Sequence, residues 1–564
     1  MKKRILIVGG VAGGASTATR IRRLDENAEI IIFEKGPHVS FSNCSLPYYL
    51  SGIVENSDDL LLMNPDIFKK RYKIEARVNH EVTRINPKEK TIQIQDLITK
   101  EEYKEEYDKL VLSPGANPIL PNIEGVSNKN VFTVRNVMDI TKLKDYINKD
   151  SIKEVAVIGG GFIGLEVAEN LKLAGHTVTL VEAANQVMPP FDYDMAQIIH
   201  KDLVDHGINL ILEDGIKGIY EKEIQLESGK SIPCQAVIMA IGVRPDIKLA
   251  KEAGLLIGER GGIKVNQHYL TSDNNIYAIG DAIEVYHSIT HKSTRLALAG
   301  PARKQARDVA NHINNMEVKN PGVIGSSVVK YFNINAATTG INEKTAKLEG
   351  FEYNTVYIIP NDMVGLMPES NPMHFKLIYE EPSGRILGAQ AIGKGNVDKR
   401  IDVIASLIMM KATIEDLKDV EVCYAPPFSN PIDVINQAAL VGLNLLNGRY
   451  KQVTTPQVRE LVEKDAFILD VREKEEYDMG HLINGKNIPL SQLRGRIGEI
   501  PKDVPVYVHC RSGQRSYNAV MLLQNLGYEN VYNIAGSFLG ICLYEYYNDT
   551  ISKREKIVTE YNFN

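Results

Sequence analysis

Two segments of the chain repeat the same order of features, and they constrain the fold more than any other part. Residues 4–34 and 155–182 each contain a β-branched run, a glycine cluster, a helical stretch and an apolar run that ends in glutamate. A buried strand that leads through a helix to a second parallel strand is a βαβ unit. Two such units predict two nucleotide-binding folds on one chain.

The second glycine cluster follows the pattern G-x-G-x-x-G. Gly159, Gly161 and Gly164 surround Phe162 and Ile163, directly between a predicted strand and a predicted helix. The first glycine allows a tight turn, the second lets a pyrophosphate approach the backbone, and the third lets the helix pack on the strand. The helix N-terminus then supplies amides and a positive dipole to the phosphates. The alternative is a plain strand–helix turn.

Glu182 ends the strand that follows this helix. A carboxylate at that position accepts hydrogen bonds from the two hydroxyls of a ribose. Ala183, Ala184 and Asn185 come next, so no arginine is there to receive a 2′-phosphate. The second fold is therefore predicted to bind NADH in preference to NADPH.

The first glycine cluster, at 9–14, departs from the strict pattern. Val11 replaces the middle glycine if the pattern starts at Gly9, and Val8 replaces the first glycine if it ends at Gly13. Glu34 lies where a ribose-binding acid belongs. Far downstream, Asp281 ends another strand and is expected to face the first fold. That arrangement requires the second fold to be inserted into the first.

Composition limits the classes of protein to which the chain can belong. The 564 residues predict three or four domains, and a net charge of -6 without a long basic run excludes an electrostatic case for nucleic acid. No stretch approaches the roughly 18 apolar residues of a membrane span, and the first apolar run is too short for a signal peptide. The five cysteines form no C-x-x-C pair. We therefore expect a cytoplasmic protein with free thiols and no metal site.

Two further regions follow the βαβ units. Short strands and then helices between 321 and 447 predict an α+β domain. Residues 448–456 are polar and are predicted to form a linker, after which 457–564 return to α/β alternation. The fold class is α/β, with two Rossmann-like domains at 1–112 plus 240–320 and at 113–239.

Five motifs together resemble the pyridine-nucleotide disulfide oxidoreductases over residues 1–445. They are 9–14, 113–115, 159–164, 241–245 and 280–281. The resemblance implies an FAD domain, an NADH domain inserted into it, and an α+β dimerisation domain, with Asp281 at the ribityl chain of FAD. The predicted cofactor-binding residues are Gly9, Gly10, Ala12, Gly13, Gly14, Glu34, Lys35, Ser113, Gly115, Gly159, Gly161, Phe162, Ile163, Gly164, Glu182, Gly242, Gly280 and Asp281.

Cys44 is the only cysteine in the region where that family carries a pair. Its Ser-Phe-x-x-Cys motif resembles the single-cysteine branch, which includes coenzyme A-disulfide reductases, persulfide reductases, and NADH oxidases and peroxidases. A thiolate beside oxidised flavin and a helix start is expected to have a lowered pKa and to attack a substrate sulfur. The alternative is a small buried apolar residue.

A predicted coenzyme A site accompanies Cys44. Arg20 and Arg23 share one face of the first helix, and arginine binds phosphate through two parallel hydrogen bonds. The resemblance to coenzyme A-disulfide reductases adds Ser16, Ser40 and Asn43 as substrate contacts. The alternative for the two arginines is a solvated helix face.

Tyr424 begins a Tyr-Ala-Pro-Pro segment that resembles the one with which this family reaches the partner's active site. It therefore implies a homodimer and a catalytic phenol. Coenzyme A-disulfide reductases also carry Tyr-Tyr-Pro where this chain has Leu366-Met367-Pro368, and a lysine where it has Ile432. These losses favour a small persulfide over the bulky disulfide.

Cys510 begins the C-terminal motif Cys-Arg-Ser-Gly-Gln-Arg, between a predicted strand and helix. Successive amides in such a turn stabilise an anionic sulfur. The loop and the surrounding residues resemble the rhodanese family, which implies catalysis by Cys510 with substrate contacts from Arg511, Ser512, Gly513 and Arg515. An inactive rhodanese-like module and a phosphatase are the alternatives.

These features together predict an NADH- and FAD-dependent reductase of coenzyme A persulfide, coupled to a rhodanese sulfur carrier. Its partners would be small thiols and persulfides. The alternatives are a coenzyme A-disulfide reductase, an NADH oxidase or peroxidase in which Cys44 cycles through a sulfenic acid, and a sulfurtransferase whose flavin half is only a scaffold.

Overall fold

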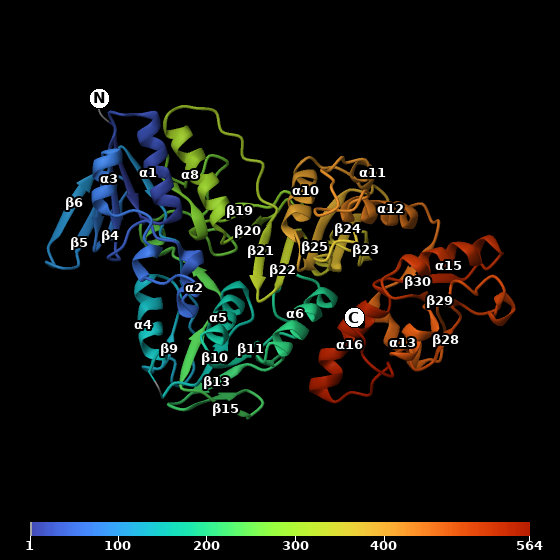
Figure 1. Ribbon diagram of the computed structural model, residues 1–564. Coiled ribbons are helices and arrows are strands. Elements are labelled where there is room, and N and C mark those ends of the chain that lie inside the picture. The colour runs from blue at the N-terminus through green and yellow to red at the C-terminus, as the bar shows by residue number, and fades with distance from the viewer. Residues whose placement is uncertain (1–2, 150, 564) are drawn as a thin grey trace. The chain divides into compact units, whose positions relative to one another are not determined.

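The computed structural model describes residues 3–149 and 151–563 (Figure 1). They form two compact units, which are treated separately below. The first comprises Met1–Ala183 with Ile211–Val323, and the second comprises Ala184–Leu210 with Ile324–Asn564. Both are α/β, and the predicted fold class is confirmed. Among the described residues, no helix has the length and apolarity needed to cross a membrane.

The first sheet of unit one is five-stranded and parallel, in the order β18-β7-β1-β2-β3. Its central strand β1 is rich in β-branched residues and is buried from Ile5 to Val8, with α1 packed against it. Strand β18 comes after the second fold in sequence yet pairs with β7, so the second fold is an insertion. The elements are β1 (Arg4–Val8), α1 (Ala12–Leu24), β2 (Glu29–Glu34), η1 (Asn43–Ser45), α2 (Leu46–Ser51), η2 (Ser57–Leu60), α3 (Pro65–Tyr72), β3 (Glu75–Val78), β7 (Lys109–Leu112), β18 (Ile276–Ala278), η3 (Gly280–Ala282), β19 (Val285–Tyr286), β20 (Ser293–Thr294) and α8 (Ala299–Ile313), with an antiparallel sheet of β4 (His80–Asn86), β5 (Thr91–Asp96) and β6 (Glu102–Glu106).

The second sheet of unit one is also parallel, with β10 between β11 and β16. Its topology repeats that of the first sheet, since the same strand–glycine–helix sequence forms its first crossover. The elements are β8 (Ala116–Pro118), β9 (Val131–Phe132), α4 (Val137–Ile147), β10 (Glu154–Ile158), α5 (Phe162–Leu173), β11 (Thr177–Val181), β12 (Asn209–Ile211), β13 (Ile216–Ile219), β14 (Glu223–Leu226), β15 (Ser231–Pro233), β16 (Ala236–Met239), β17 (Val243–Pro245) and α7 (Lys248–Glu252).

Unit two begins with an antiparallel sheet in the order β21-β22-β25-β24-β23. All eight residues of β25 are buried, because α6 and α10 both contact this strand. We assigned residues 184–210 to the NADH domain, but they group with unit two, where α6 also packs on α16. The elements are α6 (Tyr193–Asp205), β21 (Ser327–Tyr331), β22 (Ile334–Gly340), α9 (Glu343–Glu349), β23 (Tyr353–Ile358), β24 (Met373–Glu380), β25 (Ile386–Gly393), α10 (Val397–Met409), α11 (Ile414–Lys418) and α12 (Val434–Leu446).

The C-terminal part of unit two is a parallel sheet in the order β26-β30-β29-β27-β28. The predicted linker at 448–456 is wrong for residues 451–453, which form the edge strand β26 because their backbone pairs with β30. The elements are β26 (Lys451–Val453), η4 (Thr455–Gln457), α13 (Val458–Glu463), β27 (Phe467–Asp470), α14 (Lys474–Asp478), β28 (Gly485–Asn487), η5 (Ile497–Glu499), β29 (Val506–His509), α15 (Gln514–Asn525), β30 (Val531–Ile534) and α16 (Ser537–Ser552).

Candidate active sites

The two glycine clusters form the same strand-to-helix turn. Gly9 and Gly159 follow β1 and β10 with φ angles of +92° and +109°, which favour glycine. A Cβ on Gly14 would lie 1.8 Å from the carbonyl oxygen of Gly9, and one on Gly164 would lie 1.9 Å from that of Gly159. Both ends of each turn therefore require glycine, since a side chain would collide with the backbone.

Val11 takes the place of the middle glycine in the first turn. It directly precedes α1, just as Gly161 directly precedes α5. Of the two alignments that the sequence allows, the structure selects the one that starts at Gly9. A Cβ on Gly161 would meet no described atom within 4 Å beyond its own neighbours, so the turn is open at this point. An open backbone before a helix N-terminus is where a pyrophosphate binds.

The two predicted ribose acids are held beside these turns. Glu34 accepts hydrogen bonds from the backbone N–H groups of Gly10 at 2.9 Å and Gly36 at 2.8 Å. Glu182 accepts one from the N–H of Gly160 at 2.7 Å. Each carboxylate keeps further lone pairs, so it can also accept from ribose hydroxyls.

Asp281 lies beyond the end of β18, in η3, at a cavity of about 380 Å³. Burial raises the pKa of this carboxyl group. The N–H of Gly280 donates to Gln305 of α8 at 2.7 Å, which holds the turn in place. A cavity with a buried acid and polar rim fits the polyol chain of FAD. It is lined by Val243, Pro245, Arg260, Asp281, Thr294, Arg295 and Ala297.

Gly115 and Gly242 occur where the chain crosses between the two folds of unit one. Both have positive φ and immediately precede β8 and β17, which pair antiparallel. The N–H of Asp246 donates to the carbonyl of Gly115 at 3.0 Å, and its carboxylate lies 3.9 Å from Lys35. Ser113 ends the preceding strand, with its hydroxyl 2.6 Å from where a Cβ on Gly13 would lie. The predicted cofactor residues of the first fold thus surround one region.

Cys44 lies in η1 directly before α2 and is exposed. Desolvation of the sulfur, and then the charges of Glu166 and Asp281, raise the pKa of its thiol. We expected a lowered pKa beside bound flavin and a helix start, whereas the protein groups alone raise it, first by burial of the sulfur and then through the two carboxylates. Any lowering must therefore come from bound cofactor or substrate.

Glu166 of α5 and Tyr48 of α2 were missed by the sequence analysis. The phenol of Tyr48 hydrogen-bonds to Glu166, and burial raises the pKa of Glu166 to about 7 and that of Tyr48 to about 12. Ser51 donates to Asn170 at 2.6 Å and so fixes α2 against α5. Glu166 lies two residues after the glycine motif, but this position by itself predicts only an exposed residue of the helix.

The arginines of α1 separate into two kinds. Arg22 is buried and donates five hydrogen bonds to backbone carbonyls, so its role is structural. Arg20 donates twice to the side-chain oxygen of Asn311, at 3.2 and 3.0 Å. Partial desolvation, and then the charges of Arg307 and Arg23, lower the pKa of Arg20. Three guanidinium groups from α1 and α8, which pack together (Figure 1), therefore form a basic cluster that suits phosphates.

The other predicted substrate contacts differ in exposure. Asn43 is exposed beside Cys44, and Ser16 is half-buried on α1. Ser40 is only 7% exposed and has a φ of +55°. Its N–H donates to the carbonyl of Gly10 at 2.8 Å, so its backbone joins this segment to the first glycine turn.

Tyr424 lies in the loop before α12 of unit two and is exposed. The loop that carries Leu366 lies next to it, because the N–H of Val364 donates to the carbonyl of Pro426 at 3.3 Å. Leu366 and Ile432 are both exposed. The substitutions noted in the sequence therefore lie on the same surface region as the tyrosine loop.

Cys510 lies between β29 and α15 and is 1% exposed. Its sulfur accepts a hydrogen bond from the N–H of Gly513 at 3.1 Å. The hydroxyl of Ser537, which the sequence analysis missed, accepts from the Cys510 N–H at 3.3 Å. Arg511 and Ser512 are half-buried in the same loop. One loop amide, that of Gly513, therefore faces the sulfur, and the nest of successive amides stays a prediction.

A buried ion pair between Arg472 and Asp470 stabilises the structure next to this loop. Arg472 donates from its Nε and Nη2 atoms to both oxygens of Asp470, and His509 lies 3.7 Å from the same carboxylate. Burial opposes ionisation of Asp470, but His509 and Arg472 outweigh it and lower its pKa. The Nδ1 of His509 also contacts the Cys510 carbonyl at 3.1 Å. The pair therefore fixes the strand that carries Cys510.

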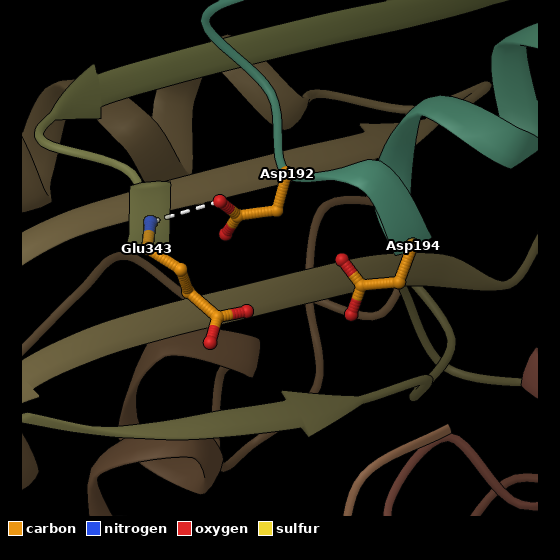
Figure 2. Close-up of side chains that lie close together, drawn as sticks. All are labelled: Asp192, Asp194 and Glu343. Atoms are coloured by element: carbon orange, nitrogen blue, oxygen red, sulfur yellow. Dashed lines mark hydrogen bonds between the residues drawn. The ribbon is translucent and has the colours of Figure 1, made fainter. Parts of the chain in front are cut away.

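Three carboxylates gather at the start of α6 (Figure 2). The N–H of Glu343 donates to Asp192 at 2.8 Å. The buried ammonium of Lys376 lies 2.8 Å from Asp194, 3.3 Å from Asp192, and also pairs with Glu343. Because this ammonium occupies the position that a cation would take, we assign no metal to the cluster.

The two nucleotide folds, the cavity at Asp281 and the exposed thiol of Cys44 together indicate a flavin-dependent oxidoreductase of the disulfide-reducing class. The chain belongs to the pyridine nucleotide-disulphide oxidoreductases, whose family model matches residues 3–306. The dimerisation domain of that family matches residues 326–434, and a rhodanese-like domain matches 454–543. Membership implies FAD and a pyridine nucleotide as cofactors.

Named relatives cover either the first modules or nearly the whole chain. Coenzyme A disulfide reductase of Staphylococcus haemolyticus is 35% identical over 435 residues, which is 77% of this chain and 98% of that protein. The crystal structure of reduced Bacillus anthracis CoADR-RHD superposes with a TM-score of 0.94 at 44% identity, over 98% of this chain and 99% of that one. An NAD-dependent persulfide reductase from A. fulgidus gives 0.91 at 34% identity, over 95% and 99%.

Proposed function

We propose that this protein uses NADH and FAD to reduce the persulfide of coenzyme A, with Cys44 as nucleophile and Cys510 as sulfur carrier. One observation carries the proposal. The chain holds an exposed thiol near Asp281 at the predicted FAD cavity, and a second thiol that accepts a hydrogen bond from a loop amide. The named persulfide reductase is similar to this chain over both modules.

The chemistry assigned to Cys44 follows from its being a single thiol. Its thiolate attacks the inner sulfur of the persulfide, the sulfur–sulfur bond breaks, and hydrosulfide leaves with the electron pair. This step leaves a mixed disulfide between Cys44 and coenzyme A. Bound FAD would supply the two-electron link to NADH. A hydride equivalent then returns Cys44 to its thiolate and releases the coenzyme A thiol.

Binding roles follow from charge and position. Glu182 and the lack of an adjacent arginine favour NADH over NADPH. Arg20 and Arg23 bind the phosphates of coenzyme A, together with Ser16, Ser40 and Asn43 nearer the thiol. Tyr424 is exposed, so in a homodimer it is free to reach the partner's Cys44 and donate a proton.

The rhodanese module is assigned the supply of sulfur. Arg511, Ser512, Gly513 and Arg515 surround Cys510 with positive charge and hydrogen-bond donors, which suits anionic sulfur donors. All five cysteines are free thiols. Free thiols fit a reducing compartment, so we place the protein in the cytoplasm.

Reduction of coenzyme A disulfide is the second candidate, because the Staphylococcus haemolyticus relative carries that name. Its leaving group is a bulky thiolate, which needs an acid and a second binding site. Exposed Leu366 and Ile432 offer neither acid nor charge next to the Tyr424 loop. Hydrosulfide is small and leaves readily, so the persulfide is favoured.

Anaerobic NADH consumption by the holoenzyme tests the proposal. Coenzyme A persulfide and coenzyme A disulfide are compared at equal concentration, with oxygen as sole acceptor in a parallel reaction. We expect the persulfide to be consumed fastest, with one sulfide released per NADH. Faster turnover of the disulfide would establish the second candidate. NADH consumption in the oxygen reaction, with none in either anaerobic reaction, would contradict both candidates.

A further inference from the structure

Arg515 is a charged residue of the motif that follows Cys510. It lies in the first turn of α15, directly after the loop in which the N–H of Gly513 donates to the sulfur of Cys510 at 3.1 Å. Its two terminal nitrogens are both bound by Glu476, with Nη1 2.5 Å from Oε2 and Nη2 2.8 Å from Oε1. Glu476, and to a smaller extent Cys510, raise the pKa of Arg515.

Glu476 is itself held in place by the backbone around it. It lies on α14, where the N–H of Glu473 donates to its Oε2 at 3.2 Å and closes a capping box. Arg472 donates to its carbonyl at 3.3 Å and is anchored in turn by the buried Asp470. The carboxylate of Glu476 is therefore a fixed point, although the pair it forms is partly exposed.

We propose that Glu476 is a positioning residue for sulfur transfer at Cys510. A two-pronged ion pair favours one orientation of the guanidinium, and in that orientation the charge of Arg515 interacts with Cys510. A guanidinium without this partner would rotate among several conformations and spend less time at Cys510. The inference rests on the proposed function of Cys510 as a sulfur carrier.

Glu476 has a second effect of opposite sign. Its negative charge partly cancels the positive charge of Arg515 near Cys510, and it also lies close to Arg511. If cancellation were its main effect, removing the charge would stabilise the Cys510 thiolate and speed its attack. If orientation is its main effect, removing the charge slows that attack. The two roles therefore predict changes in opposite directions.

The test measures sulfur transfer from thiosulfate to cyanide by the full-length holoenzyme over a range of pH. The Cys510 thiolate attacks the outer sulfur of thiosulfate, and sulfite leaves with the electron pair. Cyanide then removes that sulfur as thiocyanate and restores the thiolate, so no external electrons are needed. Thiocyanate is quantified for the wild type, Glu476→Gln, Arg515→Ala and the double variant. Glu475→Gln, an exposed acid on the same helix, is the matched control.

We expect Glu476→Gln to lower kcat/KM by about tenfold and to move the acid limb of the pH profile up by about one unit. Glu475→Gln should stay within about twofold of the wild type. The double variant should be no slower than Arg515→Ala, because Glu476 acts through Arg515. Glu476→Asp should also be slow, since the charge is kept but the shorter side chain misplaces it.

Three results would overturn the inference. Faster transfer by Glu476→Gln would show that charge cancellation dominates. Unchanged kinetics with a lower Tm would show a structural role alone. Additive losses in the double variant would separate Glu476 from Arg515. A wild type that transfers no sulfur from thiosulfate or from glutathione persulfide would instead refute the proposed function of Cys510.

Discussion

Replacing Lys376 with methionine should weaken the packing of α6 on β24 in unit two. The ammonium lies 2.8 Å from both oxygens of Asp194 and 3.3 Å from Asp192, with a further ion pair to Glu343. Figure 2 shows the three carboxylates that surround this position. Its side chain is 2% exposed, so almost no water can replace it. Removing one partner of a buried ion pair costs about 3–5 kcal/mol, because the remaining charge stays buried.

The pH dependence of this loss follows from Asp192. Burial raises its pKa to about 6 even beside Lys376, and loss of the ammonium should raise it further. The folded state then binds a proton more tightly than the unfolded chain, whose aspartate pKa is about 3.9. The contribution of Asp192 to the free energy of unfolding therefore falls as the pH rises from about 4 through the raised pKa. The defect should be largest above pH 7 and smaller at pH 5.5.

Hydrogen exchange of the holoenzyme, followed by mass spectrometry, measures this local stability. A loss of about 3 kcal/mol corresponds to exchange on the order of 100-fold faster in peptides from α6 and β24. Lys201→Met, which removes an i,i+4 surface pair on α6, is the control and should cost less than about 1 kcal/mol. Exchange less than tenfold faster, or a defect that grows at low pH, would refute the reasoning.

Three predictions concern the candidate active site of unit one. Cys44→Ser should reduce NADH-dependent persulfide reduction to background, while the visible spectrum of bound flavin persists. Cys423→Ser, which changes another exposed thiol, should stay active. Persulfide reduction by Cys44→Ser would exclude the mechanism. Glu166→Gln should lower the pH at which iodoacetamide alkylates Cys44, because it removes a charge that raises the pKa of that thiol. Alkylation is followed by mass spectrometry, and an alkylation rate unchanged from the wild type above pH 7 would contradict this. Arg20→Ala should raise KM for coenzyme A persulfide about tenfold, but not KM for pantetheine persulfide, which lacks the nucleotide phosphates. Arg84→Ala, at an exposed arginine, is the control. An equal rise in KM for both substrates would rule out phosphate binding by Arg20.

Elements whose requirements are local could be predicted closely. The short strands expected between 321 and 447 include β24 at Met373–Glu380, because β-forming residues such as Phe375, Ile378 and Tyr379 favour an extended chain. The Gly159 turn needs a positive φ and a clash-free helix start, and both are properties of adjacent residues. The family and its two cofactors followed from these motifs. The individual binding and catalytic roles remain predictions for the experiments above.

Features that depend on distant partners could not be predicted in this way. β26 has a polar sequence that reads as a linker, and it becomes a strand only because β30 offers an unpaired edge. The carboxylates of Glu166 and Asp281 are 115 residues apart, yet both raise the pKa of Cys44. Sequence spacing carries no information about such an electrostatic field, so this effect of the protein groups on the pKa of Cys44 could not be predicted.

The amino-acid sequence by itself determined the order of the modules and both nucleotide folds, and it singled out Cys44 and Cys510 as candidates for catalysis. It could do so because glycine geometry and strand periodicity act over a few residues. Only the tertiary structure decided that Val11 replaces the middle glycine, that Lys376 fills the acidic cluster, and that Glu476 pairs with Arg515. Those outcomes depend on contacts between side chains that are far apart in the sequence and that only the fold brings together.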